Sequence, residues 1–253
     1  MTRRLPSLIS ALAVSAALTT PAMAFDVGAM TAAERAAFGA EIRRYILDNP
    51  EIVFEAAALV EQRRQQDQAA GDVALVANNA ADLFDNPDAW EGGNPQGDIT
   101  LVEFIDYRCG YCRRAHGDVA ELIASDGNIR FIVKELPILG EASVISSRFA
   151  IATRLVAGDD AYKAAHDALV TLNSDLNDRT LTRLARTLDL DADAILAEMD
   201  SPEVTRIIND TRQLAQRMNI SGTPTFVMGN QMLRGYLPLD GMRQVLDQVR
   251  AEG

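Results

Sequence analysis

The chain has only two cysteines, Cys109 and Cys112, and two residues separate them. They follow an apolar run over residues 99–107 that predicts a buried strand, and they precede a stretch with helical periodicity over 112–125. A cysteine at the start of a helix meets free backbone N–H groups and the positive end of the helix dipole, which stabilise a thiolate. The second cysteine lies one turn further on, where it can attack a mixed disulfide. The pair therefore predicts a redox-active dithiol.

The N-terminal residues predict export. Arg3 and Arg4 precede a short apolar segment over residues 8–18, and Ala22-Met23-Ala24 is a small-residue cleavage site. This pattern is typical of a cleavable signal peptide over residues 1–24 and is too short for a membrane anchor, although a retained anchor is the alternative. Export together with a reactive dithiol favours the bacterial periplasm as the location.

Composition narrows the possible partners and the role of the cysteines. The formal net charge of −12 argues against nucleic acid and anionic lipid as partners. No other apolar run is long enough to span a bilayer, so we expect a soluble exported chain. Exported proteins that depend on structural disulfides carry more cysteines, and a bridge across so short a loop constrains the unfolded chain weakly. A reactive pair is therefore favoured over a structural disulfide.

Residues 25–72 predict a helical arm. Thr31 and Glu34 have the spacing of a capping box, and Asn49-Pro50 separates the first helix from a second one. Both helices carry an apolar stripe, which in the first consists of Phe38, Ile42, Tyr45 and Ile46. Two short helices cannot bury these stripes against each other well enough to be stable alone. We expect an oligomerisation arm, and folding back on the chain's own domain is the alternative.

The rest of the chain predicts an α/β domain after a linker. Turn signals at 86–87 and 92–95 predict a linker over residues 73–96, with a short helix near its start. Residues 97–253 then follow the order strand, helix, strand, a run of helical segments over about 141–218, two strands and a helix. This order predicts a catalytic domain that is interrupted by a helical insertion.

This order and its motifs resemble the thioredoxin superfamily, and the insertion narrows the resemblance to the DsbA-like proteins. The motifs are Val102 to Cys112, Leu136-Pro137 and Gly222 to Phe226. The helical arm looks like that of the suppressor-of-copper-sensitivity branch, some members of which oligomerise through it. The resemblance implies a thioredoxin-like fold and thiol–disulfide exchange through a redox-active Cys109–Cys112 disulfide, with no metal and no other cofactor.

The same resemblance implies roles for individual residues. Cys109 matches the nucleophile and Cys112 the resolving cysteine, while Thr223-Pro224 matches a loop whose proline is cis and faces the disulfide. An ordinary trans turn proline is the alternative for Pro224. Glu103, six residues before Cys109, matches a buried acid that relays a proton to the resolving thiol. Burial of a carboxyl is costly unless it is protonated or paired, so we expect a raised pKa that would make Glu103 a usable base. Lys134 is a possible partner for it.

The residues around the cysteines bear on the direction of the reaction. The strong oxidases of the family carry Pro-His between the cysteines, whereas Gly110-Tyr111 looks like the pair of disulfide isomerases. Threonine before the cis-proline also resembles isomerases. Losing the histidine removes a partner of the thiolate, which predicts a less oxidising centre. Arg108, Arg113 and Arg114 either compensate by stabilising the thiolate or lie solvated at the surface.

We therefore expect a disulfide isomerase or reductase that acts on unfolded or misoxidised client proteins, with a membrane thiol reductase or oxidase as its redox partner. The alternatives are a dithiol oxidase, a Cu(I)-handling protein that uses the same dithiol, and a chaperone without redox chemistry. A metal site made of Cys109, Cys112 and His116, with His166 as a possible fourth ligand, is a further alternative, although lone histidines are more often surface or helix residues.

Overall fold

A computed structural model describes residues 27–252 of the chain. The predicted signal peptide over residues 1–24 lies outside the described residues. The chain divides into two units, Met1–Val60 and Glu61–Gly253, which are described separately below. None of the helices among residues 27–252 combines the length and the hydropathy that a membrane crossing requires.

In the N-terminal unit, the described residues form helices with exposed apolar side chains. A short 3₁₀ helix, Val27–Ala29, precedes α1, Ala32–Asp48, and α2, Glu51–Asn78, begins in this unit. The predicted capping box is confirmed, because the Glu34 amide donates to Thr31 Oγ1 at 3.3 Å and the Thr31 amide donates to Glu34 Oε2 at 2.8 Å. Helix α1 has no buried residue, and the whole predicted stripe from Phe38 to Ile46 is exposed.

The second unit is built on a five-stranded sheet in the order β1-β3-β2-β4-β5. Strands β2 and β3 are parallel, and the other three pairings are antiparallel. The parallel pair needs a crossover connection, which helix α4, Gly110–Asp126, supplies. The strands are β1 Trp90–Gly93, β2 Ile99–Ile105, β3 Ile129–Glu135, β4 Thr225–Met228 and β5 Gln231–Arg234.

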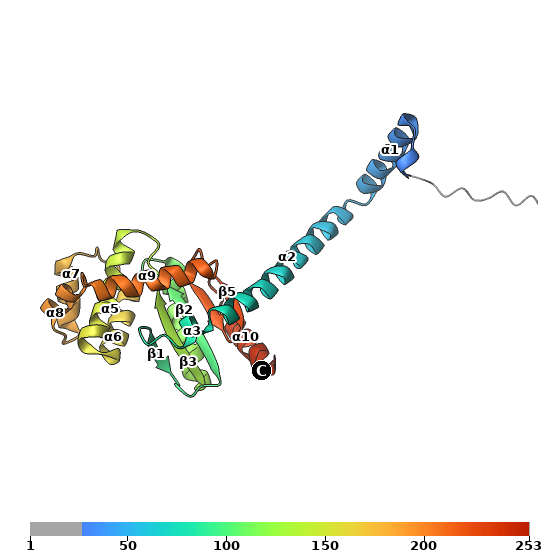
Figure 1. The fold of residues 1–253 in the computed structure, drawn as a ribbon. Helices are drawn as coiled ribbons and strands as arrows, with labels where there is room; N and C mark the ends of the chain where they lie inside the picture. Colours follow the sequence, from blue (N-terminus) through green and yellow to red (C-terminus); the bar gives the residue numbers. More distant parts are fainter. Residues whose placement is uncertain (1–26, 253) are drawn as a thin grey trace, which may run out of the picture. The chain divides into compact units, whose positions relative to one another are not determined.

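Helices cover both faces of this sheet (Figure 1). Helix α4 and the last helix, α10, Leu239–Glu252, pack on one face, where the side chains of Leu101, Val119 and Leu246 share one apolar cluster. The end of α2, the short helix α3, Ala80–Phe84, and helix α9, Pro202–Arg217, contribute to a second cluster, on the side of Val102 and Phe104. The last five residues of β2 and of β3 are all buried, as expected of central strands that are covered on both faces.

The predicted helical insertion lies between β3 and β4, which confirms the DsbA-like thioredoxin fold with its helical insertion. Figure 1 shows α5 to α8 gathered beyond one end of the sheet, with α9 returning along it. Polar N-caps start several of these helices, as Asn177, Asp191 and Ser201 each accept a hydrogen bond from the third amide that follows. The insertion comprises α5 Glu141–Ala157, α6 Asp159–Thr171, α7 Asp178–Thr187, α8 Ala192–Glu198 and α9 Pro202–Arg217.

The interval 73–96, predicted as a linker, contains the end of α2, helix α3 and strand β1 instead. Trp90 in β1 is buried, stacks on Tyr162 at 5.5 Å between ring centroids, and donates from Nε1 to the Asp159 carbonyl at 3.1 Å. The glycines that indicated a loop are needed for close packing: a Cβ on Gly93, which has a φ of +69°, would lie 2.3 Å from the Ile129 carbonyl oxygen.

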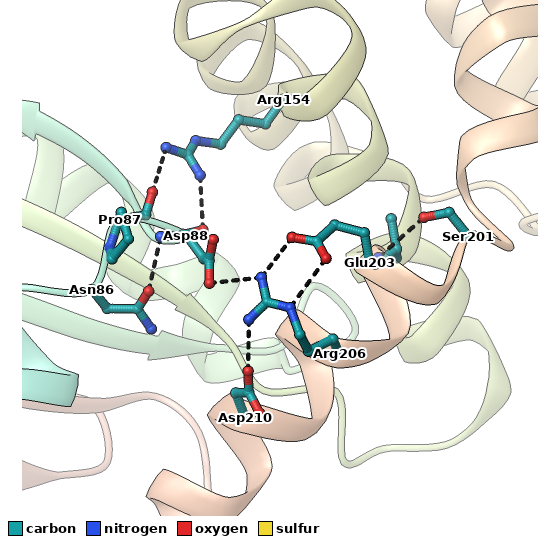
Figure 2. A network of polar contacts seen from close by, with 9 residues as sticks. Asn86, Pro87, Asp88, Arg154, Ser201, Glu203, Arg206 and Asp210 are labelled. Atoms are coloured by element: carbon teal, nitrogen blue, oxygen red, sulfur yellow. Dashed lines mark hydrogen bonds and ion pairs between the residues drawn. The ribbon is translucent and has the colours of Figure 1, made fainter.

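Arginines from the insertion hold the loop that leads into β1 (Figure 2). Arg154 on α5 donates to the carbonyl oxygens of Pro87, at 3.1 Å, and Asp88, at 2.8 Å. Arg206 on α9 donates to the Asp88 carboxylate at 2.8 Å and also contacts acidic residues on its own helix. These contacts connect the insertion to the edge of the sheet and so help to position β1 beside Tyr162.

Candidate active site

The turn between β2 and α4 is set by a buried carboxylate. Asp106 Oδ2 accepts from the amides of Ile138, at 2.8 Å, and Leu139, at 3.1 Å, while Oδ1 accepts from the Arg108 amide at 2.8 Å. The Asp106 carbonyl also accepts from the Cys109 amide at 3.0 Å. Asp106 was not singled out from the sequence, although an acid directly after a buried strand is a usable signal. These bonds place Cys109 at the start of α4.

The two cysteines lie together at the N-terminus of α4, near disulfide distance. Cys109 is the N-cap residue, with an extended backbone, and its side chain makes no capping hydrogen bond. It is 7% exposed, whereas Cys112 is completely buried. The first-turn amides of α4 have no partners within the helix, so a negative charge on the Cys109 sulfur is favoured there.

The loop before β4 lies against the Cys109 sulfur. The Thr223–Pro224 peptide bond is cis, as predicted, and the Cys109 thiol donates to the Thr223 carbonyl oxygen at 3.1 Å. Two hydrogen bonds hold this loop, since Thr225 Oγ1 donates to the Gly222 carbonyl at 2.8 Å and the Gly235 amide donates to the Pro224 carbonyl at 2.9 Å. Residues 114 positions apart in the chain thus form one site.

Cys112 is held as a neutral thiol. Burial raises its pKa well above the usual value, and the negative charge of Glu103 acts in the same direction, while a backbone hydrogen bond with Asp106 opposes the shift. The more accessible Cys109 and the buried Cys112 are therefore suited to different steps, the first to attack and the second to resolution after a proton has left it.

Glu103 is a buried carboxyl close to this thiol. It is 2% exposed, its Oε1 has no hydrogen-bond partner, and burial together with the nearby Glu135 raises its pKa from 4.5 to about 8. It also lines a cavity of about 210 Å³ between α4, α6 and the sheet. A carboxyl that titrates near neutrality beside a space large enough for water can receive and release a proton.

The predicted pairing of Glu103 with Lys134 is wrong. In the parallel register, Phe104 lies opposite Lys134 and Glu103 lies opposite Val133, so the two charged side chains are on opposite faces of the sheet. The Lys134 ammonium instead donates to the Asp82 carbonyl oxygen at 2.7 Å.

Glu135, which the sequence reasoning missed, is the charged neighbour on the Glu103 face. Its Oε1 accepts from the hydroxyls of Tyr107, at 2.8 Å, and Tyr162, at 2.6 Å. Burial raises its pKa to about 7, and these two hydrogen bonds oppose the shift. Alternation along β3 could have predicted this position from the sequence, because Glu135 follows Lys134 directly and its side chain must therefore face the opposite side of the sheet.

The three arginines near the cysteines have other partners. Arg113 donates to the carbonyl oxygens of Tyr107, at 3.0 Å, and Leu172, at 2.7 Å. Arg108 reaches the same Leu172 carbonyl at 3.5 Å, and the Arg114 guanidinium lies 5.7 Å from the centre of the Tyr236 ring. These side chains connect the start of α4 to the end of α6 and to the segment after β5. They therefore have a structural role in addition to any stabilisation of the thiolate by their positive charge.

The histidines lie together, but not with the cysteines. His116 and His166 form a group with Asp167 in which one potential ligand atom from each lies within 4.8 Å of the others, and neither cysteine belongs to this group. The alternative metal site made of both cysteines and both histidines is therefore wrong. Burial lowers the pKa of His166 to about 3, with the neighbouring His116 acting in the same direction.

Comparison with known families identifies the domain that carries the two cysteines. The DSBA-like thioredoxin domain matches residues 100–247, which is more than half of the chain. The chain belongs to the DSBA-like thioredoxin family. A second family, the copper resistance protein ScsC N-terminal domain, matches residues 34–67 within the predicted arm. This DSBA-like protein thus combines a thioredoxin domain that contains a Cys-x-x-Cys pair with a match to an ScsC N-terminal domain.

Two solved structures share this fold. A thioredoxin-like oxidoreductase from Silicibacter pomeroyi is 38% identical with a TM-score of 0.63, and the match covers 68% of this chain and 97% of that one. ScsC from Proteus mirabilis in a transitional conformation is 22% identical with a TM-score of 0.64, over 88% of this chain and all of that one.

Among curated proteins, the Na(+)/H(+) antiporter NhaA 3 of Salinispora tropica is 31% identical over 144 residues. That match takes in 56% of this DSBA-like chain and 22% of the antiporter, so the chain spans about a fifth of that relative.

The raised pKa of Glu103 predicts a dependence of stability on pH. Between pH 4.5 and about 8 the folded protein keeps a proton on Glu103 that the unfolded chain has lost, so the free energy of unfolding falls as the pH rises. At 1.36 kcal/mol per unit, the loss from Glu103 is roughly 3 kcal/mol by pH 7. Glu103→Gln should flatten this slope, as measured by urea unfolding of the oxidised protein, in which neither thiol titrates.

Glu121→Gln, an exposed substitution on α4, is the matched control and should keep the wild-type slope. Equal slopes for the wild type and Glu103→Gln would show that Glu103 is ionised in the folded protein at pH 7.

Proposed function

We propose that this DSBA-like protein is a periplasmic protein disulfide isomerase and reductase that acts through Cys109. The observation that carries the proposal is the asymmetry of the dithiol: the Cys109 sulfur lies at the helix N-terminus against the Thr223 carbonyl, and Cys112 is buried behind it. The predicted signal peptide over residues 1–24 supplies the location.

The first step is attack of the Cys109 thiolate on a client disulfide. The client S–S bond breaks, a mixed disulfide forms between Cys109 and one client sulfur, and the other client sulfur leaves as a thiolate. In isomerisation a different client thiolate attacks the client sulfur of the mixed disulfide. The client then gains a new disulfide and the Cys109 thiolate is restored, with no net transfer of electrons.

In reduction, Cys112 resolves the mixed disulfide. Its proton passes to the ionised form of Glu103, its sulfur attacks Cys109, and the client sulfur leaves as a thiolate. Two electrons pass to the client and the Cys109–Cys112 disulfide forms. A membrane thiol reductase is then the partner that returns the dithiol to its reduced state.

We place the client's backbone along the loop that contains Thr223 and Pro224. An extended peptide can pair with exposed backbone groups, and the contact of the Thr223 carbonyl with Cys109 brings such groups to the reacting sulfur. Tyr111 is 61% exposed between the cysteines and offers an aromatic surface to unfolded, apolar chains. The partners are accordingly unfolded or misoxidised proteins.

Isomerase chemistry requires a dithiol that a reducing partner keeps reduced and whose disulfide is not a strong oxidant. Gly110 and Tyr111 supply no side-chain cation next to the Cys109 thiolate, in contrast to the Pro-His pair of the strong oxidases. A dithiol oxidase is the second candidate.

A further alternative is a Cu(I)-handling role. The match of residues 34–67 to a copper resistance domain supports it, and two adjacent thiolates suit this soft ion.

We also propose that the arm assembles copies of the chain. The ScsC N-terminal domain match and the exposed stripe on α1 support this, since an exposed apolar face on a helix needs a partner to be buried. A homo-oligomer places several Cys109 sites around one client, which favours isomerisation over single oxidation events.

Two refolding assays separate the candidate activities. The wild type should restore activity to scrambled ribonuclease faster than it forms disulfides in reduced ribonuclease. Cys109→Ala should lose both activities. The double variant Gly110→Pro/Tyr111→His should shift the balance toward oxidation, because the histidine stabilises the thiolate. Activity of the wild type only on reduced ribonuclease would identify an oxidase instead.

The arm is tested in the full chain by placing charge in the α1 stripe. Phe38→Glu together with Tyr45→Glu should convert the oligomer to a monomer by light scattering, because a carboxylate in an apolar interface is costly. Arg43→Gln, an exposed change on the same helix, is the control and should leave the mass unchanged. A monomeric wild type would refute the assembly while leaving the dithiol chemistry intact.

A further inference from the structure

Three side chains of the kinds that bind metal ions meet where α4 packs against α6. His116 comes from α4, and His166 and Asp167 are neighbours on α6. The imidazole rings of the two histidines lie 5.4 Å apart between centroids, and one nitrogen or oxygen of each of the three residues lies within 4.8 Å of the others. We propose that these residues form a binding site for a divalent ion of the zinc class, separate from the dithiol.

Hydrogen bonds already orient His166 as a ligand. The Tyr107 hydroxyl donates its proton to Glu135 at 2.8 Å and lies 3.0 Å from His166 Nδ1. Since the hydroxyl proton is used on Glu135, the Tyr107 oxygen accepts from Nδ1–H, which leaves the lone pair on His166 Nε2. A metal-binding histidine typically donates its second ring N–H to an acceptor, and here the acceptor is the Tyr107 oxygen, which is itself held by the Glu135 carboxylate. His166 is 2% exposed, so this orientation is held by packing as well.

Asp167 offers an oxygen without a partner. Its Oδ1 is buried and accepts no hydrogen bond, yet it lies 3.3 Å from His116 Nε2. A buried carboxylate oxygen that lacks a donor is costly, and a cation between it and the imidazoles would remove that cost. The structure thus has both the ligand atoms and a carboxylate oxygen without a hydrogen-bond donor in one place.

Both histidines also line the cavity of about 210 Å³ that Glu103 reaches. Three protein ligands leave the fourth position of a tetrahedral ion open, and the cavity has room for a water molecule there. Two imidazoles and one carboxylate suit Zn²⁺, whereas Cu(I) prefers thiolates and Mg²⁺ prefers oxygen ligands. The donor set therefore differs in chemical preference from the cysteine pair.

Lys163 is the group that opposes the ion. Its ammonium lies 2.5 Å from Asp167 Oδ2 and lines the same cavity. A bound dication would be repelled by this charge, so loss of the ammonium should strengthen binding. This gives the proposal a variant that should improve the site, and such a gain is not expected from general damage to the fold.

The test is calorimetric titration of the full chain with Zn²⁺, using the oxidised form so that neither thiolate can bind the ion. We expect one ion per chain, affinity reduced about tenfold or more in His116→Gln and in Asp167→Asn, and affinity increased in Lys163→Gln. Asp160→Asn, an exposed change on the same helix, is the matched control and should bind as the wild type does.

Co²⁺ provides an independent readout, because a tetrahedral site should give visible absorption that His116→Gln removes. No uptake of Zn²⁺ by the oxidised wild type would overturn the proposal. Uptake that His116→Gln and Asp167→Asn leave unchanged would overturn it too, since the ion would then occupy other acidic groups on the surface.

Discussion

The site depends on the position of one sulfur at the start of a helix. Asp106 fixes the turn after β2 through three backbone amides, and this turn places Cys109 at the N-cap of α4. The same position brings the sulfur to the Thr223 carbonyl. Cys109 lies beside the free amides of the helix start and keeps 7% of its surface exposed, whereas Cys112, one turn further on, is fully buried.

Two buried carboxyls lie behind the dithiol. Glu103 and Glu135 share one face of the sheet, and Val133, not a lysine, lies opposite Glu103. Burial raises the pKa of both carboxyls toward neutrality, to about 8 and about 7. Glu103 lines a cavity whose walls include neither Cys109 nor Cys112. We therefore propose that a proton reaches Glu103 through this cavity, apart from the Thr223 loop where we place the client.

Local patterns were sufficient for much of this architecture. The apolar strands, the capping box at Thr31 and the Cys-x-x-Cys motif each depend on neighbours in the chain, and the resemblance added the cis bond before Pro224. Strand β1 was missed because its glycines indicate a loop until the contact with Ile129 is known. The partner of Glu103 depends on register, where one residue decides the face. The meeting of α4 with α6 at the histidines depends on tertiary packing alone.

The most direct test of the account is alkylation of the reduced, folded protein with iodoacetamide at neutral pH, followed by mass mapping of the modified cysteines. The account predicts rapid modification of Cys109 and protection of Cys112, with Cys112 reacting only after denaturation. Resistance of both thiols until the fold is melted, or equal rates at the two positions, would contradict it.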